Sequence, residues 1–339
     1  MSHIAIDVHK KTSTVAWLDP ATGEVGERKI YTTRQEVAEL LETLSRPWIV
    51  AIEATRQSPA VCDWLRALDS EIHLVEPQKL SLMARLQNAK TDLKDARLML
   101  HAMLHDYLPE AYLAPPEVAE KRDLFHAHNN LRQIATKLRN LLRSLLNKAD
   151  LDLSVSDLLG TQARPQVEEQ LARMAPNRLA AARAYWDLLV TTEAQLAQVD
   201  QRIRTEVKAD RLGRELVKLP GVGPILAYGW LALLGDLSRF GSYKQLCSYA
   251  GLAPRSARSD EFHADGHLPQ RCNKALRHVT MLAVQSAINA KAWSRAQGTY
   301  ERLVKCKPKA TAKVAAGREL LRDVYFLGKR TAAAPSPAR

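Results

Sequence analysis

The sequence is poor in cysteine and has no long apolar run. Its four cysteines, Cys62, Cys247, Cys272 and Cys306, are scattered over 339 residues without a Cys-x-x-Cys pair. This scarcity argues against a zinc site and against a disulfide framework. No run of about 18 uncharged apolar residues could cross a membrane, and the N-terminus lacks a signal-peptide pattern. These absences predict a soluble cytoplasmic protein with no membrane partner.

Positive charge is concentrated toward the C-terminus. The formal net charge is +12 at pH 7. Residues 211–339 contain 22 lysines and arginines against 8 aspartates and glutamates, whereas residues 1–210 contain 27 against 29. Such a basic region attracts polyanions, and nucleic acid is the favoured class. An acidic membrane surface would attract the same charge.

The first hundred residues alternate between strand and helix patterns. Three strands are expected in residues 2–31, then a helix in TTRQEVAELLETL with Thr33 as its N-cap. A buried strand at 48–54, a helix in SPAVCDWLRALD, a strand in EIHLVEP and a further helix follow. Three strands, helix, strand, helix, strand, helix is the order of a ribonuclease-H-like fold. We therefore expect an α/β N-terminal domain of this type.

The rest of the chain reads as helical. Seven-residue repeats occur in two stretches: Leu124, Leu131, Leu138 and Leu145 with Ala127, Ile134 and Leu141 between them, then Leu189, Leu196 and Ile203 with Tyr185 and Val199. Two coiled-coil arms are predicted, paired with each other or with a second chain, although ordinary bundle helices would also fit. The predicted domains are 1–110 (α/β), 111–212 (coiled coil), 213–330 (basic, mainly helical) and 331–339 (disordered tail).

Four acids are candidates for a metal site. Asp7 falls in the middle of the strand IAIDVHK, where a buried charge is costly without a partner. Glu53 ends the strand that a ribonuclease-H-like sheet places beside the first, and Asp92 and Asp95 share one helix face. Converging carboxylates would repel one another, and magnesium relieves this repulsion while supplying phosphoryl-transfer chemistry. Solvated positions, or a hydrogen bond to a nearby loop, are the alternative for each acid.

The basic region contains two further candidate features. In LPGVGPILAYGWLALLG, the turn with Gly221 and Gly223 looks like a helix-hairpin-helix whose backbone N–H groups hold a DNA phosphate. A plain connecting turn is the alternative. Downstream, a loop with Ser256 and Ser259 is surrounded by basic residues, namely Arg255, Arg258, Arg271, Lys274 and Arg277. A serine there could attack a phosphate or only contact one.

Several motifs together resemble a known family. The start IDVHK, the segments IEAT and TDLKDA, the turn LPGVGP, and YAGLAP followed by an Arg/Ser loop and NKALR resemble the insertion-sequence one-ten family of DEDD transposases, relatives of Piv-type DNA invertases. The match runs in order through nearly the whole chain. It implies a RuvC-like domain with four acids, a coiled-coil domain that assembles subunits, and a transposase domain whose serine forms a covalent phosphoserine link with DNA.

The resemblance assigns roles to individual residues. The acids are Asp7, Glu53, Asp92 and Asp95, and the serine, five residues after the proline of Gly-Leu-x-Pro, is Ser259 rather than Ser256. Two positions depart from the family pattern, because Asp260 and Cys272 stand where the family usually has glycine. An acidic neighbour could alter the approach of phosphate, and a lost glycine restricts the backbone. Either change could impair this copy.

The resemblance also implies partners. Some family members are guided by a structured RNA that pairs with both donor and target DNA, and a large basic surface suits two nucleic acids. A homo-oligomer, dimer or tetramer, is expected. An arm of about thirty helical residues spans roughly 45 Å, so a site within one subunit would need the arms to fold back, and assembly across subunits is easier. The resemblance implies the same, with the acids of one subunit meeting the serine of another.

The predicted function is a magnesium-dependent DNA transposase or site-specific recombinase that acts on double-stranded donor and target DNA at the bacterial nucleoid. Two alternatives stay open. A RuvC-like structure-specific nuclease would use the four acids and water, and would not need Ser259. A non-catalytic nucleic-acid-binding descendant of a transposase would bind whether or not the acids and the serine were intact.

Overall fold

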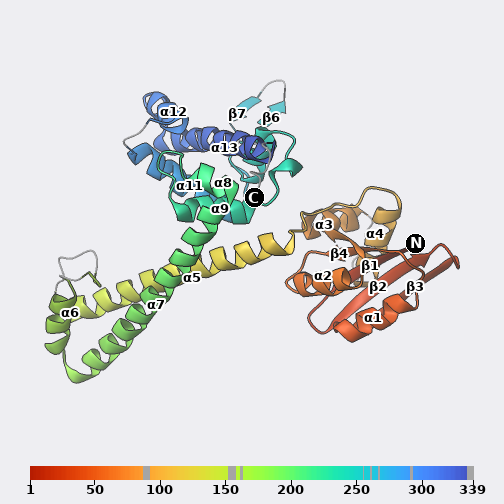
Figure 1. Ribbon diagram of the computed structural model, residues 1–339, viewed down its shortest axis with the longest axis horizontal. Coiled ribbons are helices and arrows are strands. Elements are labelled where there is room, and N and C mark those ends of the chain that lie inside the picture. Colours follow the sequence, from red (N-terminus) through yellow and green to blue (C-terminus); the bar gives the residue numbers. More distant parts are fainter. Residues whose placement is uncertain are drawn as a thin grey trace. The chain divides into compact units, whose positions relative to one another are not determined.

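The protein consists of two compact units, Met1–Leu113 and Ala114–Arg339 (Figure 1). The structure is a computed structural model. It describes residues 1–86, 92–151, 158–160, 163–254, 256–259, 262–265, 268–290 and 293–333. The first unit contains a five-stranded sheet with helices, and the second is mainly helical. Within the described residues, no helix combines the length and apolar character that a membrane crossing requires.

The first unit has the predicted succession of strands and helices. Its strands are β1 (Ser2–Val8), β2 (Thr12–Asp19), β3 (Glu24–Tyr31), β4 (Trp48–Glu53) and β5 (Glu71–Val75). Its helices are α1 (Arg34–Glu42), α2 (Ser58–Ala67), α3 (Pro77–Leu86) and α4 (Asp92–Leu104). The spatial order of the strands is β3-β2-β1-β4-β5. The first three strands pair antiparallel, and β4 pairs parallel with both β1 and β5. Thr33 caps α1 as predicted, since its side chain accepts a hydrogen bond from the N–H of Glu36 (3.2 Å).

The two faces of this sheet differ in the size of their side chains. One face carries large residues such as Ile4, Ile6 and Ile52, which pack with α1 and α2. The other carries Ala5 and Ala51 at its centre, packed with α3 and α4. Because successive residues of a strand point to opposite faces, the odd-numbered residues of β1 and β4 lie on the face that α3 and α4 cover. Small side chains there let the α4 helix approach the sheet closely.

The second unit begins with a long helical hairpin. Its helices are α5 (Pro116–Lys148), α6 (Ala163–Ala172) and α7 (Pro176–Ala209). The helices α5 and α7 run antiparallel and pack along their length (Figure 1). Around α6, Leu142 and Trp186 belong to one hydrophobic cluster. At the opposite end, Phe125, Ile203 and Val207 belong to the core of the C-terminal helices. The two predicted arms therefore pair with each other within one chain.

The predicted heptad line on α5 is not the buried line. The residues of α5 that are buried are Phe125, His128, Ala135, Leu138, Leu142 and Leu146. Of the predicted leucines only Leu138 is buried, and Ile134 is 47% exposed. Two apolar lines lie side by side on this helix, and periodicity cannot tell which one meets α7. On α7 the prediction is closer, because Leu189 and Ile203 are buried.

The hairpin also corrects the argument from arm length. Because α7 returns to the start of α5, the two ends of the arm lie together. Lys121 pairs with Asp210 (3.1 Å), and Arg122 Nε donates to the carbonyl oxygen of Ala232 (3.0 Å). The length of the arms therefore gives no reason to expect acids and serine from different subunits.

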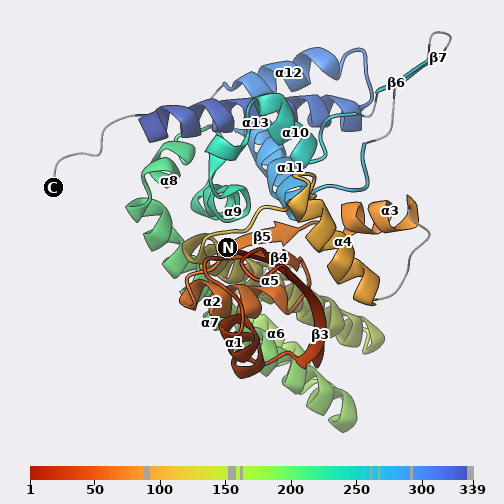
Figure 2. The ribbon, with the colours of Figure 1, turned by 90° about the vertical axis from the view of Figure 1, so that its right-hand side faces the viewer.

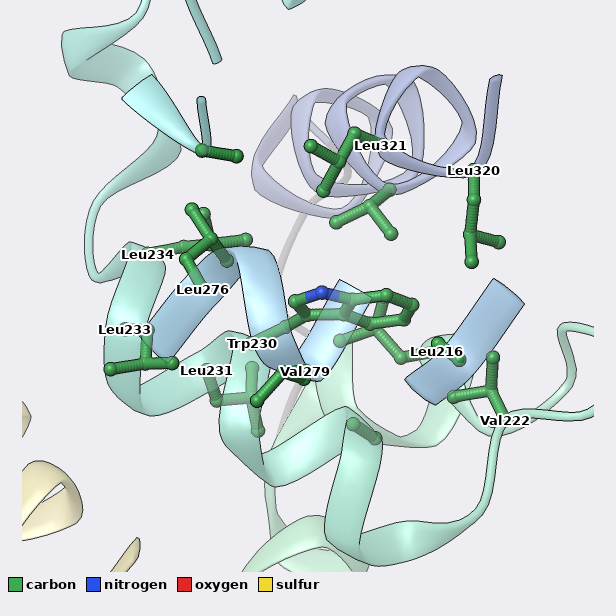
Figure 3. Packing of buried hydrophobic residues seen from close by; sticks show 14 of the residues in the cluster. Leu216, Val222, Trp230, Leu231, Leu233, Leu234, Leu276, Val279, Leu320 and Leu321 are labelled. Atoms are coloured by element: carbon green, nitrogen blue, oxygen red, sulfur yellow. The ribbon is translucent and has the colours of Figure 1, made fainter. Parts of the chain in front are cut away.

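Short helices surround one apolar helix in the C-terminal part. The elements are α8 (Arg211–Leu216), α9 (Pro224–Leu234), the 3₁₀ helix η1 (Leu237–Arg239), α10 (Tyr243–Tyr249), β6 (Ser256–Ser259), β7 (Phe262–Asp265), α11 (Lys274–Asn289), α12 (Arg295–Leu303) and α13 (Lys309–Ala333). The helix α9 is buried on all sides from Ala227 onward, as expected for a helix without a polar face. Figure 3 shows Trp230 of α9 among Leu216, Val222 and Leu320. Its indole N–H donates to Thr280 (3.3 Å).

Candidate functional site

The pairing of β1 with β4 brings Asp7 and Glu53 to neighbouring positions. The parallel register runs from Ser2 opposite Trp48 to Ile6 opposite Ile52, and Asp7 and Glu53 come one residue later. Both occupy odd-numbered positions on the face covered by α4. The two carboxyl groups thus lie at the same edge of adjacent strands, where the sequence predicted them.

The pKa of Glu53 indicates that other carboxyl groups lie close to it. Asp7 is only 2% exposed. Burial raises the pKa of Glu53 to about 7, and the charges of Asp7 and Asp95 and a hydrogen bond with Asp7 act in the same direction. Carboxylates that share a site cannot all ionise easily, because like charges repel in a poorly solvated environment. The Glu53 carboxyl group is therefore expected to change between its protonated and ionised forms near neutral pH.

The α4 helix supplies the other two predicted acids. Its first residue is Asp92, whose side chain lies outside the described part of the structure. Asp95 lies one turn later, next to Ala96, which is fully buried against the alanines of the sheet. Asp95 is half-buried, and because its charge helps to raise the pKa of Glu53 it lies within electrostatic range of that residue.

Two residues that the sequence analysis did not single out also contact these acids. His9 Nε2 lies 3.2 Å from Asp7 Oδ2, and the imidazole is about half exposed. Ser58 Oγ donates to the carbonyl oxygen of Glu53 (2.5 Å) and accepts from the N–H of Thr55 (2.6 Å). These contacts fix the backbone where β4 ends. The sequence signals for them are that His9 belongs to the motif IDVHK and that Ser58 follows IEAT by three residues.

Asp19 shows what a structural acid looks like in the same sheet. It too is 2% exposed. Its carboxylate accepts from the backbone N–H groups of Ala21 and Ser45 (3.0 Å each). The Ser45 N–H is the largest cause that lowers the pKa of Asp19. Asp19 is thus stabilised as an anion by donors, whereas Glu53 is surrounded by other carboxyl groups.

The donor set suits a hard divalent cation. Carboxylate oxygens are the ligands that magnesium prefers, and a cation would relieve the repulsion that raises the pKa of Glu53. Within the described residues, no group of three or more His, Cys, Asp or Glu side chains is already spaced to hold a metal ion. The side chain of Asp92 is not among those residues. Asp7, Glu53 and Asp95 therefore supply suitable ligand atoms but do not by themselves form a metal-holding group in this structure.

Ser259 lies in a β-hairpin rather than a loop. The strands β6 and β7 pair antiparallel, with Ser256 opposite Asp265 and Ser259 opposite Phe262. Ser259 is thus the last residue of β6, at the turn. Asp260 and Arg255 lie outside the described residues, and Arg258 is placed only by its position in β6.

The family motifs around this hairpin act as structural braces. Gly251 has φ +69°, and a Cβ there would lie 2.6 Å from Cys272 Sγ and would clash with the Arg277 guanidinium. Arg277 donates to the carbonyl oxygens of Pro269 and Ala250 (3.4 Å for the latter). This predicted phosphate contact therefore binds the main chain at the base of the hairpin.

Hydrogen bonds from a side chain also fix the start of α11. The Asn273 side chain caps this helix by accepting from the Leu276 N–H (2.9 Å), and its amide donates to Tyr249 Oη (3.2 Å). Arg271 and Lys274, on either side of it, are exposed. Their side chains are available to a polyanion.

The two glycines of the turn LPGVGP have different environments. Gly221 has φ +77°, and a Cβ there would lie 2.5 Å from the backbone nitrogen of Ala287. Gly223 is the N-cap of α9 and is exposed, and a Cβ there would meet no neighbouring atom within 4 Å. Gly221 is thus required for packing against α11, and Gly223 leaves the start of α9 open to a ligand.

Two family models match most of the chain. Residues 4–149 match the DEDD model of the IS110 group, described as "Transposase". Residues 213–299 match the model described as "Transposase IS116/IS110/IS902 family". The first match contains all four predicted acids, and the second contains Ser259 and the turn LPGVGP.

Individual relatives agree with these models. A "Probable family 20 transposase" of Pseudomonas aeruginosa is 25% identical over 296 residues, which are 85% of this chain and 84% of the relative. The "Insertion element IS116 uncharacterized 44.8 kDa protein" of Streptomyces clavuligerus is 32% identical over 100 residues, 30% of this chain and 25% of that protein. The "Transposase for insertion sequence element IS1111A" of Coxiella burnetii is 21% identical over 277 residues, 81% and 74% of the two chains.

The two turn glycines should respond differently to alanine. Gly221→Ala should lower the free energy of unfolding by about 3 kcal/mol, because it adds left-handed strain and a backbone clash. Gly223→Ala, the matched control, should cost about 0.5 kcal/mol as an N-cap change. Urea denaturation of the two variants measures the difference. Equal losses would contradict the assigned packing of Gly221.

The raised pKa of Glu53 predicts a pH-dependent stability. The folded protein holds the Glu53 proton more tightly than the unfolded chain, whose glutamate pKa is near 4.5. In a chelating buffer this contribution is therefore present below about pH 4.5 and is lost as pH rises through 7. Glu53→Gln mimics the protonated acid, so it should match wild type at pH 5 and exceed it at pH 8.

Melting temperatures from pH 5 to 8, with and without magnesium, test this assignment. Magnesium should raise the melting temperature of wild type at pH 8 and have little effect on Glu53→Gln, which lacks the ligand charge. A difference between the two proteins that stays constant over the whole pH range would show that Glu53 does not titrate in this window.

Proposed function

This chain belongs to the IS110 family of DEDD transposases, and we propose that it cuts and rejoins DNA through a covalent phosphoserine intermediate. The observation that carries the phosphoryl-transfer part of the proposal is the position of Asp7 next to Glu53, whose pKa is raised to about 7 by burial and neighbouring carboxyl groups. The serine part is supported by the match of residues 213–299, which include Ser259, with the transposase model. The strand order β3-β2-β1-β4-β5, antiparallel and then parallel, is the order expected of a ribonuclease-H-like domain. Perturbed acids at the edge of such a sheet favour metal-dependent phosphoryl transfer.

The acids would hold the metal and leave the attack to the serine. Asp7, Glu53, Asp92 and Asp95 would bind Mg²⁺, which when bound activates an attacking oxygen and stabilises a leaving oxygen at the scissile phosphate. Asp7 and Glu53 supply ligand oxygens from rigid strands. Ser58 holds the backbone of Glu53, and His9 orients the Asp7 carboxylate.

The serine step conserves phosphoester bonds. The Ser259 hydroxyl attacks the phosphorus, a serine–phosphate ester forms, and the bond to one deoxyribose oxygen breaks, with that oxygen taking up a proton. In the second step a deoxyribose hydroxyl of another strand attacks the phosphoserine and releases Ser259. The energy of the first ester is kept in the second, so rejoining needs no nucleotide cofactor.

The C-terminal part would hold the DNA. Arg271 and Lys274 are exposed at the start of α11, next to the base of the β6–β7 hairpin. With Arg255 and Arg258 they would bind phosphates around Ser259, while the N–H groups at the start of α9, after Gly223, would bind a further phosphate. A structured guide RNA and a dimer or tetramer of this chain complete the proposal.

Removing the acids should abolish chemistry and spare binding. Asp7→Asn and Glu53→Gln should each lower strand cleavage by on the order of a thousandfold, with DNA affinity retained and no loss of melting temperature. Asp63→Asn is the matched control, since Asp63 is exposed on α2 and pairs only with Arg66 among the described contacts. Cleavage by both acid variants at the wild-type rate would exclude the metal site.

The covalent intermediate separates serine attack from hydrolysis by water. Trapped cleavage complexes should carry DNA on Ser259, and Ser259→Ala should form none, whereas Ser256→Ala should still form them. DNA mapped to Ser256 would shift the nucleophile by three residues. Free ends without any protein-linked DNA would favour the structure-specific nuclease instead, and binding without any cleavage would favour a non-catalytic descendant.

Mixing inactive variants tests whether the site is shared between subunits. If acids of one protomer meet the serine of another, Asp7→Ala and Ser259→Ala proteins, each inactive alone, should regain some activity together. The double variant mixed with either single variant should stay inactive, since it supplies no complete site. Free subunit exchange without activity would show that one chain provides both parts.

Sequencing of RNA that co-purifies with the wild-type protein tests for the guide RNA.

A further inference from the structure

A cavity lies along the C-terminal half of α13, with Leu219, the first residue of the turn LPGVGP, also in its wall. Its volume is about 640 Å³, and its wall includes Arg295 of α12 with Arg322, Phe326, Lys329 and Arg330 of α13. A smaller cavity of about 310 Å³ continues it toward Arg211 of α8. Both cavities are lined by Leu327 and Arg330, so together they form one groove, here called the α13 groove.

The α13 groove is separate from the β6–β7 hairpin. Leu252, shortly before β6, packs against Gly317 of α13. Arg330 lies thirteen residues farther along the helix, which corresponds to roughly 20 Å. Figure 2 shows the hairpin near one end of α13 and the C-terminus of this helix at the other end. A ligand in the groove would therefore not compete with one bound at Ser259.

The charge of the groove selects an anion. The two cavities together are lined by five cationic side chains, counting Arg211, and two carboxylates, Asp323 and Glu215. Glu215 pairs with Lys218 at 2.6 Å. The Asp323 carboxylate faces Arg295 at 3.4 Å, and about half of the Arg295 side chain is exposed. Arg322 lies near Glu319 at 3.5 Å, a weak pair with donors to spare. The cations thus exceed what the neighbouring acids neutralise, as expected for a surface that binds phosphates.

An exposed aromatic ring distinguishes this groove from a simple anion site. Phe326 is 46% exposed, in a chain with only four phenylalanines. The Arg322 guanidinium lies 6.0 Å from the centre of its ring and 5.5 Å from that of Tyr243. These two contacts hold the Arg322 side chain beside the ring of Phe326, and both residues line the groove. A cationic wall with an accessible ring is the combination that binds a phosphate backbone and stacks an unpaired base.

We propose that the α13 groove binds single-stranded nucleic acid, with its cations on consecutive phosphates and an unpaired base stacked on Phe326. A duplex keeps its bases stacked inside, so it cannot offer a base face to a ring in the wall of a groove. An acidic peptide would satisfy the cations but leave the ring without a stacking partner. This site is independent of the acids and of Ser259, and it holds whether or not they are catalytic.

The aromatic ring is tested by two substitutions of similar size. Phe326→Leu keeps apolar volume and loses the ring face, so affinity for a 20-nucleotide thymine or uracil oligonucleotide should fall about tenfold. Phe326→Tyr should keep wild-type affinity. Affinity for a 20-base-pair duplex should not change in either variant. Fluorescence anisotropy with full-length wild type and both variants measures their affinities for the oligonucleotide and for the duplex.

The cations are tested by the dependence of binding on salt. Lys329→Gln/Arg330→Gln should reduce the slope of log affinity against log salt concentration by about 1.4, that is 0.7 for each lost phosphate contact on a single strand. Lys307→Gln/Lys309→Gln is the matched control, because both lysines are exposed and the net charge change is the same. The slope of the control should stay at its wild-type value.

The site would be overturned if Phe326→Leu bound the oligonucleotide as tightly as wild type, or lost as much affinity for the duplex as for the oligonucleotide. It would also be overturned if the two charge variants had equal salt slopes, or if a polyglutamate peptide of equal charge displaced the oligonucleotide. Melting temperatures of all variants show whether they are folded. Deoxyribose and ribose oligonucleotides of one sequence identify the natural strand, and tighter binding of either supports the site. Because cleavage is not measured, the result is independent of the proposed chemistry.

Discussion

The register between β1 and β4 is the constraint on which the first unit depends. A shift of one residue would move Asp7 from the face under α4 to the face filled by α1 and α2. There a carboxylate would meet large apolar side chains with no partner. The isoleucines on one face and the alanines on the other therefore fix the register, and the register places Asp7 beside Glu53.

Two buried acids of the same sheet show how surroundings decide a role. Backbone N–H groups stabilise the Asp19 carboxylate and lower its pKa, so that this side chain fastens a turn. Glu53 is half-buried with other carboxyl groups as neighbours, and its pKa rises to about 7. A repelling pair costs stability in the absence of a cation. Such a cost is expected at a functional site rather than in a structural one.

Most of the motif residues in the C-terminal part support structure. Gly221 lets a turn approach α11, Gly251 makes room for Cys272 and Arg277, and Asn273 caps α11. Together they hold the base of the β6–β7 hairpin. From sequence alone, Gly221 could belong to a phosphate-binding turn or to a plain connecting turn, and Arg277 could contact a phosphate, because a glycine-rich turn and an arginine look alike whether their partner is DNA or the protein's own backbone.

The sequence by itself determined the order of strands and helices, the Thr33 cap and the family, because alternation, capping residues and short motifs are local properties of the chain. Only the tertiary structure decided that the two arms pair within one chain, and through which face of α5, because adjacent apolar lines on a helix have the same periodicity. The contact of Arg122 with Ala232, and the positions of Arg211 and Arg295 against α13, join residues that no local pattern relates. Their proximity follows from packing, which depends on side chains from several elements at once.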